Sequence, residues 1–333
     1  MRALAKILLC SALCLNLTKV AAEQSTKPEV NDQVEAFITM MTEKHQFEAD
    51  FIRQTLSNAE KNQTILDAIA KPWEAKPWHQ YYPIFLTDKR LVKGVEFWQQ
   101  HKDDLQRAEQ ETGVPAQIIV SIIGVETFYG TYKGKYSVLD ALYTLGFHYA
   151  PRSKFFRSEL AEYFLLTREE GFDLDEVKGS YAGAMGWGQF ISSSYRHYAV
   201  DFDGDGVRDL LNNPTDAIGS VANYFKRHGW KDGEPVAFKA SVPVSNDKID
   251  KLISKSLKYK HTWQDLEAAG VSLSDEVSLT PQQSVKLLAF QQTDNTEYWV
   301  GLPNFYTITR YNHSPLYAMA VFQFSQQLKQ AME

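Results

Sequence analysis

The sequence predicts a mainly α (α+β) fold that includes a small mixed α/β segment. Apolar residues recur at helical spacing within Val34–Ala70, Leu91–Glu111 and Pro115–Phe128. The pattern changes after Trp230, where residues 236–244 alternate apolar with polar side chains, as in a strand. The 333 residues, 44% of them hydrophobic, provide for two or three domains with real cores. A disulfide miniprotein and a disordered chain are therefore excluded.

The net charge argues against a general nucleic-acid binder. The formal charge is −6 at pH 7, with 41 acidic residues against 35 basic ones. Such binders carry a broadly basic surface that neutralises phosphates. We therefore expect no nucleic-acid partner.

Residues 1–22 have the pattern of a cleaved export signal. Arg2 and Lys6 form a basic start, residues 7–17 are largely apolar, and small residues end the segment at Ala21 and Ala22. The apolar run is too short to span a bilayer. We expect a soluble periplasmic protein that begins at residue 23.

Both cysteines of the chain lie inside this signal. Cleavage after Ala22 removes Cys10 and Cys14, so the mature protein has no thiol chemistry. The alternative is a lipid anchor on Cys14 that holds the protein at the outer membrane. Ser11 and Leu13 stand where a bacterial lipoprotein signal has an aliphatic and a small residue, which favours the soluble form.

The remaining elements follow in order along the chain. We expect two or three helices over Val34–Ala70, followed by a connection that Pro72, Pro77 and Pro83 keep from continuing as a helix. Pro115 is expected as the first residue of its helix. Helices are then predicted at Leu91–Glu111, Pro115–Phe128, Arg157–Arg168, Pro214–His228 and Leu316–Met332, with a mixed α/β insertion after residue 235.

Glu126 is a candidate general acid. It stands near the C-terminal end of the apolar helix that begins at Pro115. Apolar surroundings and the negative end of the helix dipole both disfavour an ionised carboxylate, so its pKa should be raised. A carboxylic acid that keeps its proton near neutrality can protonate a leaving oxygen. The alternative is a helix-end glutamate that points into solvent.

The segment Ser180–Phe190 combines small residues with aromatic and amide side chains. Glycine is costly in helices and strands, so a run of this kind suits close backbone approach. Aromatic faces stack on sugars, and the Gln189 amide can donate and accept hydrogen bonds. The alternative is a packed glycine-rich turn.

The acidic run that begins at Asp201 follows the EF-hand pattern. Oxygen ligands fall at positions one, three and five, Gly206 at position six, and the Val207 carbonyl at position seven. Position twelve is Asn212 instead of the usual glutamate, and Asp216 could close the site if the loop is longer. We expect a structural Ca²⁺ site, with an acidic turn as the alternative. The expected ligands are Asp201, Asp203, Asp205, Val207 and Asp216.

Together these segments resemble the lytic murein transglycosylase B family. The resemblance rests on Gly124–Gly130, Ser180–Phe190, the acidic loop, Asp216–Phe225 and Arg310–Ser314, and it covers Val34 to Leu328. It implies a lysozyme-like core. After the predicted signal peptide (1–22), the implied organisation is a helical domain (23–110), a catalytic core (111–235) with its EF-hand-like loop at 201–216, a small mixed α/β domain (236–302) and a return to the core (303–333).

The resemblance also implies the reaction. The family cleaves the β-1,4 bond between N-acetylmuramic acid and N-acetylglucosamine in peptidoglycan without water, and the muramoyl C6 hydroxyl closes on C1 to leave a 1,6-anhydro end. Glu126 would act first as acid and then as base. Matching positions imply a glycan groove formed by Ser180, Gln189, Phe190, Tyr224, Tyr311, Asn312 and Tyr317, together with Tyr81 and Arg152.

Two other functions fit part of the pattern. A lysozyme-type muramidase would use the same acid but deliver water, and a non-catalytic peptidoglycan-binding protein would keep only the aromatic groove. We expect a monomeric enzyme that acts on peptidoglycan strands and needs no organic cofactor. Its protein partners would be those of cell-wall synthesis or hydrolysis.

Overall fold

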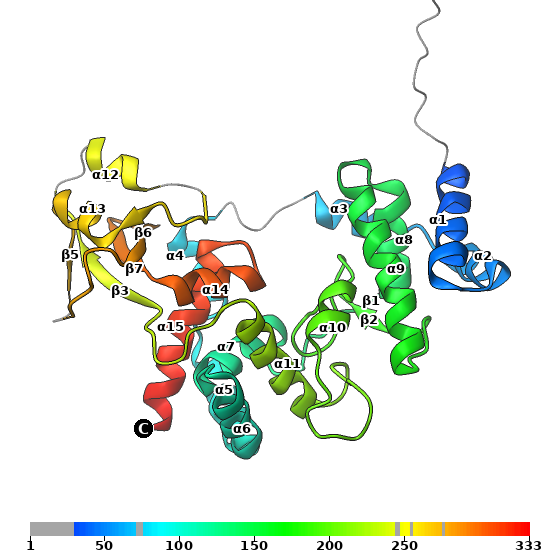
Figure 1. Cartoon of the computed structure of the whole chain (residues 1–333), viewed down its shortest axis with the longest axis horizontal. Coiled ribbons are helices and arrows are strands. Elements are labelled where there is room, and N and C mark those ends of the chain that lie inside the picture. The colour runs from blue at the N-terminus through cyan, green and yellow to red at the C-terminus, as the bar shows by residue number, and fades with distance from the viewer. Residues whose placement is uncertain (1–29, 71–75, 244–246, 254–255, 275–276) are drawn as a thin grey trace, which may run out of the picture.

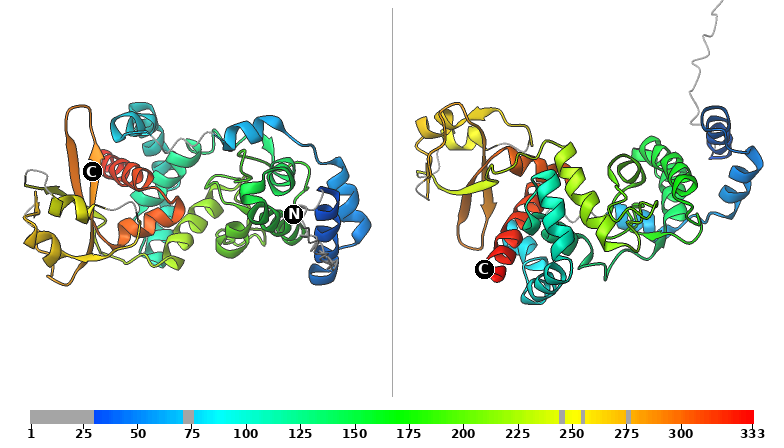
Figure 2. Two further views of the ribbon diagram at one scale, coloured as in Figure 1. Left: turned by 90° about the horizontal axis from the view of Figure 1, so that it is seen from above. Right: turned by 60° about the horizontal axis from the view of Figure 1, so that its bottom comes forward.

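The computed structural model describes residues 30–70, 76–243, 247–253, 256–274 and 277–333. Helices dominate it, with one five-stranded sheet at one end and helices α1 and α2 at the other (Figures 1 and 2). The predicted mainly α (α+β) fold is confirmed. The predicted signal peptide lies outside the described residues. Within the described part of the chain, no helix is long and apolar enough to cross a membrane.

The first three helices pack against two helices from the middle of the chain. α1 and α2 contact each other, α1 also contacts α8 and α9, and α3 contacts α8. Phe37 of α1 meets the rings of Phe147 and Phe164, which come from α8 and α9. The bounds of these helices are Val30–His45 (α1), Ala49–Asn58 (α2), Gln63–Ile69 (α3), Val138–His148 (α8) and Ser153–Glu170 (α9).

The connection that the prolines were predicted to keep from continuing as a helix contains two short helices in its described part, and Pro72 lies outside the described residues. Pro77 is the N-cap of α4 (Trp78–Tyr81), and Pro83 lies in the 3₁₀ helix η2 (Tyr82–Ile84). Trp78 and Tyr81 are buried there. This short segment therefore brings aromatic side chains inward instead of extending a helix.

Helix α7 (Ala116–Thr127) is the central helix of the core. It is buried along almost its whole length and contacts α5, α6, α11 and α15. Pro115 is its N-cap, one residue earlier than predicted, with a β-region ψ of 140°. The other core helices are α5 (Asp88–Gln100), α6 (Lys102–Thr112), α11 (Pro214–Arg227), α14 (Pro303–Tyr311) and α15 (Pro315–Met332).

Between these two groups of helices lies the segment that carries the loop motifs. A two-stranded sheet joins β1 (Tyr136–Ser137) to β2 (Lys178–Gly179). The 3₁₀ helix η3 (Ala150–Arg152) precedes α9, and α10 (Ser192–Tyr198) packs on α9 and α11. This segment carries both Ser180–Phe190 and the acidic loop.

The predicted mixed α/β insertion is a sheet with its own small core. All its strand pairs are antiparallel, in the order β4-β6-β7-β3-β5. Trp263 and Leu266 of α13 pack in this core with Leu287 of β6. The elements are β3 (Ala237–Ser241), α12 (Asp247–Leu252), β4 (His261–Thr262), α13 (Trp263–Ala268), β5 (Ser272–Leu273), β6 (Ser284–Gln291) and β7 (Thr296–Gly301).

Candidate active site

Glu126 is the penultimate residue of α7, and the chain turns sharply after it. Phe128 and Tyr129 both take left-handed backbone conformations, with φ of 50° and 56°. Such values are uncommon for residues other than glycine. The Thr127 hydroxyl lies 2.9 Å from the carbonyl oxygen of Trp187. The end of α7 is thus fixed directly beside the glycine-rich segment.

Glu126 is half-buried, and its carboxyl group is hydrogen-bonded. The hydroxyl of Tyr317, from α15, donates to Oε1 at 2.6 Å. Burial raises the pKa of Glu126 to about 7, although the hydrogen bond from Tyr317 opposes the rise. The predicted rise in pKa is therefore found, with burial as its main cause. The alternative of a glutamate that points freely into solvent is wrong.

The Ser180–Phe190 segment forms a tight double turn. Isolated bridges pair Met185 with Gly179 and with Phe190. The Ser180 hydroxyl accepts hydrogen bonds from the amides of Ala182 and Ala184, so it closes its own turn. The packed glycine-rich turn is therefore confirmed, and sugar binding by this segment stays a prediction.

Glycine is required where this turn approaches the acidic loop. Gly186 has φ of 73°, and a Cβ at this position would lie 2.3 Å from the carbonyl oxygen of Leu210. The neighbouring Trp187 amide donates to that carbonyl at 2.9 Å. Close backbone approach, as predicted, is the reason for the small residue.

A cavity of about 600 Å³ lies beside this turn. It brings together residues from four separate segments of the sequence. Six of the predicted binding residues line it: Arg152, Gln189, Phe190, Tyr224, Tyr311 and Asn312. The cavity has the size and aromatic lining of a small-ligand or sugar-binding groove.

The aromatic residues of the cavity hold one another in place. The rings of Tyr224 and Tyr311 are 4.8 Å apart, and Phe190 lies 5.8 Å from Tyr311. The Tyr311 hydroxyl donates to the carbonyl oxygen of Gly188 at 2.6 Å. Burial raises the pKa of Tyr311, and the nearby negative charge of Glu126 raises it further. Tyr311 therefore connects the cavity with Glu126.

The other predicted binding residues, Tyr317, Tyr81 and Ser180, do not line the cavity. Tyr317 contacts Glu126 directly, and Tyr81 is buried on α4. The sequence reasoning missed His228, Arg310 and His313, which do line the cavity; the last two belong to the run Arg310–Ser314 on which the family resemblance rests in part.

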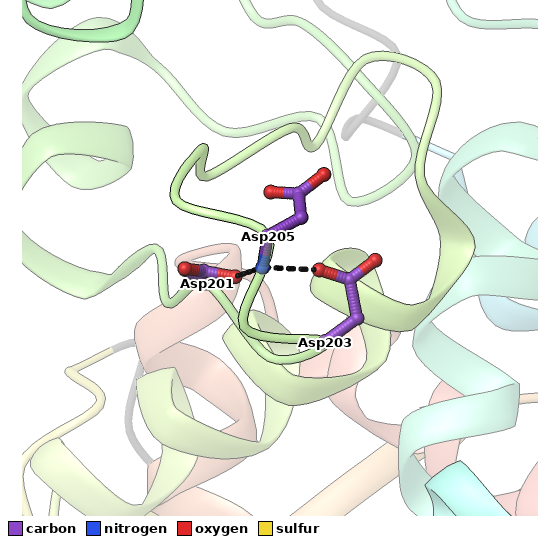
Figure 3. A group of neighbouring side chains, drawn as sticks. All are labelled: Asp201, Asp203 and Asp205. Carbon is purple, nitrogen blue, oxygen red and sulfur yellow. Dashed lines mark hydrogen bonds between the residues drawn. The ribbon is translucent and has the colours of Figure 1, made fainter.

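The acidic loop gathers three carboxylates at the surface (Figure 3). One oxygen each from Asp201, Asp203 and Asp205 lies within 4.8 Å of the others. Asp201 accepts hydrogen bonds from the amides of Gly204, Asp205 and Gly206. These bonds lower the pKa of Asp201, with that from Gly206 as the largest cause. Asp201 is thus held in its ionised form, and carboxylate oxygens are the type of ligand that Ca²⁺ binds.

Asp216 has a different place in this loop. It is fully buried in the first turn of α11, and its oxygens accept from the amides of Phe202 at 2.7 Å and Asp209 at 2.8 Å. It thereby ties the two ends of the loop together, and burial raises its pKa. Its role as a metal ligand stays a prediction.

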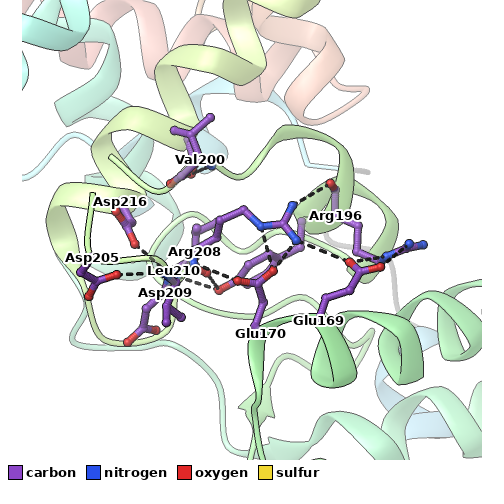
Figure 4. A network of polar contacts seen from close by, with 12 residues as sticks. Glu169, Glu170, Arg196, Val200, Asp205, Arg208, Asp209, Leu210 and Asp216 are labelled. Atoms are coloured by element: carbon purple, nitrogen blue, oxygen red, sulfur yellow. Dashed lines mark hydrogen bonds and ion pairs between the residues drawn. The ribbon is translucent and has the colours of Figure 1, made fainter. Parts of the chain in front are cut away.

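An ionic network joins the acidic loop to the helices beside it (Figure 4). Arg208 of the loop pairs with Glu169 and Glu170 at the end of α9. Arg196 of α10 pairs with Glu169 and with Glu162. The acidic loop and α10 are thus both held against α9.

Comparisons with known proteins identify the family. A family model described as the transglycosylase SLT domain matches residues 29–326. The chain is also 44% identical over 306 residues to the membrane-bound lytic murein transglycosylase B of Escherichia coli K12, which covers 89% of this chain and 82% of that protein. The chain belongs to the SLT transglycosylase family.

Solved structures of SLT transglycosylases have the same fold. Soluble lytic transglycosylase SltB1 from Pseudomonas aeruginosa is 48% identical, with a TM-score of 0.85 over 90% of this chain and 99% of that one. The lytic transglycosylase Slt35 from Escherichia coli, solved with bulgecin A, is 44% identical, with a TM-score of 0.82 over 90% and 93%. The protein is therefore a lytic transglycosylase with a lysozyme-like, mainly α fold, and its substrate is peptidoglycan.

Proposed function

We propose that Glu126 alone serves as both acid and base in this reaction. The observation that carries the proposal is the half-buried Glu126 at the end of α7, whose carboxyl group has a pKa of about 7 and receives a hydrogen bond from Tyr317. A group with this pKa gives up and regains a proton readily near neutral pH. The same group can therefore act in both halves of a cleavage that uses no water.

In the first half, protonated Glu126 donates its proton to the glycosidic oxygen between N-acetylmuramic acid and N-acetylglucosamine. The bond from muramoyl C1 to that oxygen breaks, and the N-acetylglucosamine side leaves with the proton as a hydroxyl. In the second half, the C6 hydroxyl attacks C1 and gives its proton to the Glu126 carboxylate. A 1,6-anhydro ring forms, the enzyme regains its proton, and no water is consumed.

The family supports this reaction over a muramidase reaction, because the relatives SltB1 and Slt35 are named as lytic transglycosylases. Glu126 does not itself line the cavity, and Tyr311, whose pKa its charge raises, connects the two. Glycosidases that use two carboxylates place them on either side of the scissile bond. A muramidase would also need a means of activating water, whereas the anhydro route needs only Glu126.

The groove would hold the glycan through aromatic stacking and amide contacts. Phe190, Tyr224 and Tyr311 offer ring faces, while Gln189 and Asn312 offer amides that can pair with hydroxyl or acetamido groups. Tyr317 and Tyr81 would set the environment of the acid, Ser180 would shape the turn, and Arg152 would bind anionic parts of the substrate. A relative at 27% identity, SltB3 from Pseudomonas aeruginosa, was solved with NAG-NAM-pentapeptide, which supports a glycan in this groove.

We also propose that the acidic loop binds Ca²⁺ as a structural ion. Three gathered carboxylates and the Val207 carbonyl provide hard oxygen ligands, and left-handed glycines at 204 and 206 allow the turn. The relative Slt35 was solved in complex with calcium. The ion would stabilise the loop and takes no part in the proposed reaction.

The location follows from the substrate. Peptidoglycan lies outside the cytoplasmic membrane, and residues 1–22 have an export pattern, so we propose a periplasmic enzyme. The relative in Escherichia coli is named as membrane-bound. The intact mass of the exported protein distinguishes a chain that begins at residue 23 from one lipidated at Cys14.

Release of muropeptides by matched glutamine variants tests the role of Glu126. Glu111 is the penultimate residue of α6, as Glu126 is of α7, but it is exposed. We expect Glu126→Gln to reduce release from purified peptidoglycan by about 100- to 10,000-fold while glycan binding persists. Glu111→Gln should behave as the wild type. Release by Glu126→Gln at the wild-type rate would contradict the proposal.

A further inference from the structure

Arg90 of α5 joins three segments at the end of the helix that carries Glu126. Its Nε donates to the carbonyl oxygen of Gly124, in the last turn of α7, at 3.0 Å. Its Nη1 donates to the carbonyl oxygens of Ile84 and Phe85, at 2.7 and 2.5 Å. One guanidinium group thus ties the end of α7 to the turn that follows α4.

The charge of Arg90 is directed at backbone carbonyls. None of the ion pairs between described residues involves it. Its guanidinium lies 5.5 Å from the ring centroid of Phe85 and 5.3 Å from that of Phe128. A cation is favourable beside the last carbonyls of a helix. A planar fork between two rings is also an arrangement that lysine cannot reproduce.

The turn that Arg90 supports is tightly packed. The hydroxyl of Tyr129 fits between α5 and α7, since a Cβ on Gly94 or Gly124 would lie 2.3 or 2.4 Å from it. Phe128 and Tyr129 both have positive φ. Non-glycine residues keep such conformations only where the surrounding contacts hold them.

We propose that Arg90 is a positioning residue, which fixes the last turn of α7 and thereby holds the carboxyl group of Glu126 in its contact with Tyr317. Arg90 acts through the backbone, because its hydrogen bonds reach Gly124 and not Glu126 itself. The inference rests on the proposed role of Glu126 and adds to it the residue that holds the acid in place.

Tyr317 from α15 and Tyr311 from α14 face Glu126, and Arg90 from α5 and Tyr129 face the end of its helix. Tyr81 from α4 interacts electrostatically with Tyr317. Of these, Tyr317 donates directly to the carboxyl group, and Tyr311 and Tyr317 respond to its charge. If the last turn of α7 loosens, Glu126 gains water and its pKa falls toward the ordinary value.

Steady-state kinetics of Arg90→Lys and Arg90→Met test the proposal. We expect kcat on soluble peptidoglycan to fall by about 10- to 100-fold, as for a reacting group displaced by an ångström, with KM within about twofold of the wild type. The alkaline limb of the pH profile should move to lower pH. Arg53, an exposed arginine of α2 paired with Glu35 and Asp50, provides the matched controls Arg53→Lys and Arg53→Met.

A merely structural role would give a different result. It would lower the Tm of the Arg90 variants but leave kcat per folded molecule and the pH profile unchanged, which would overturn the proposal. A rise in KM alone would also overturn it. If Arg90→Met does not fold, Arg90→Lys, which keeps the charge, decides the question.

Titration of the Glu126 carboxyl carbon by NMR separates this proposal from the proposed reaction. In Arg90→Lys the Glu126 pKa should be lower than in the wild type, whether or not the wild type releases anhydro products. An unchanged pKa would overturn the positioning role. Absence of anhydro products from the wild type would instead contradict the proposed reaction.

Discussion

The same chemical group occupies two opposite environments in this molecule. Glu126 lies at the end of a buried helix, receives one hydrogen bond from a hydroxyl, and has its pKa raised to about 7. Asp201 lies in an exposed loop and receives three backbone hydrogen bonds, which lower its pKa. Burial keeps a proton on the first carboxyl group, and amide donors keep the second one ionised. The first suits proton transfer and the second suits binding of a cation.

The largest effect on folding stability should come from replacing the carboxyl group of Glu126. The pKa of Glu126 is about 7 in the folded protein against an ordinary value of 4.5. Between these two values the unfolded chain ionises while the folded protein keeps its proton, so stability falls as the pH rises and stays lower above pH 7. Glu126→Gln should therefore be more stable than the wild type at pH 8, by up to about 3 kcal/mol.

Scanning calorimetry at pH 4 and pH 8 checks this prediction. The Tm of Glu126→Gln should exceed that of the wild type at pH 8, and the difference should disappear at pH 4. Glu111→Gln should show no such dependence, because its side chain is exposed. An equal difference at both pH values would mean that the burial of Glu126 does not shift its ionisation.

The second largest effect on stability should come from Ca²⁺ bound to the acidic loop. Ca²⁺ at about 100 times its Kd should stabilise the folded protein by about 2.7 kcal/mol and raise the Tm by a few degrees. Asp203→Asn removes one of the three gathered charges and should abolish most of the rise. Asp103→Asn, at an exposed position on α6, should respond to Ca²⁺ as the wild type does. A Tm that does not change with Ca²⁺ would contradict the proposed metal site.

The smallest effect should come from Tyr317→Phe. The Tyr317 hydrogen bond lowers the pKa of Glu126, so its loss should raise that pKa further. Since the reaction begins from the protonated acid, the alkaline limb of the pH profile should move to higher pH, by about 0.7 unit for a hydrogen bond worth about 1 kcal/mol. A shift to lower pH would show that water entry outweighs the lost hydrogen bond.

The sequence predicts local features of the molecule well. Glu126 is recognisable because it is a lone acid in an apolar helix, and the acidic loop because its ligands are spaced two residues apart. The helices at Pro115–Phe128, Pro214–His228 and Leu316–Met332 agree with the structure to within a few residues. Each of these signals lies within one short segment.

Sequence patterns do not predict contacts between segments that lie far apart in the chain. Tyr317 and Glu126 are 191 residues apart, and the contact of Arg90 with Gly124 crosses from one helix to another. Helix α8 is almost fully buried, so its sequence has no amphipathic pattern. The hydrophobic periodicity therefore did not predict it. The order of strands in the sheet depends likewise on pairing that the chain order does not specify.

The most direct test of the central claim is mass analysis of muropeptides released in ¹⁸O-labelled water. We expect products with 1,6-anhydro ends, one water lighter than those of a muramidase and free of ¹⁸O, because the C6 hydroxyl and not water attacks C1. Products with reducing ends that carry ¹⁸O would contradict the proposed reaction, since they would show that Glu126 delivers water.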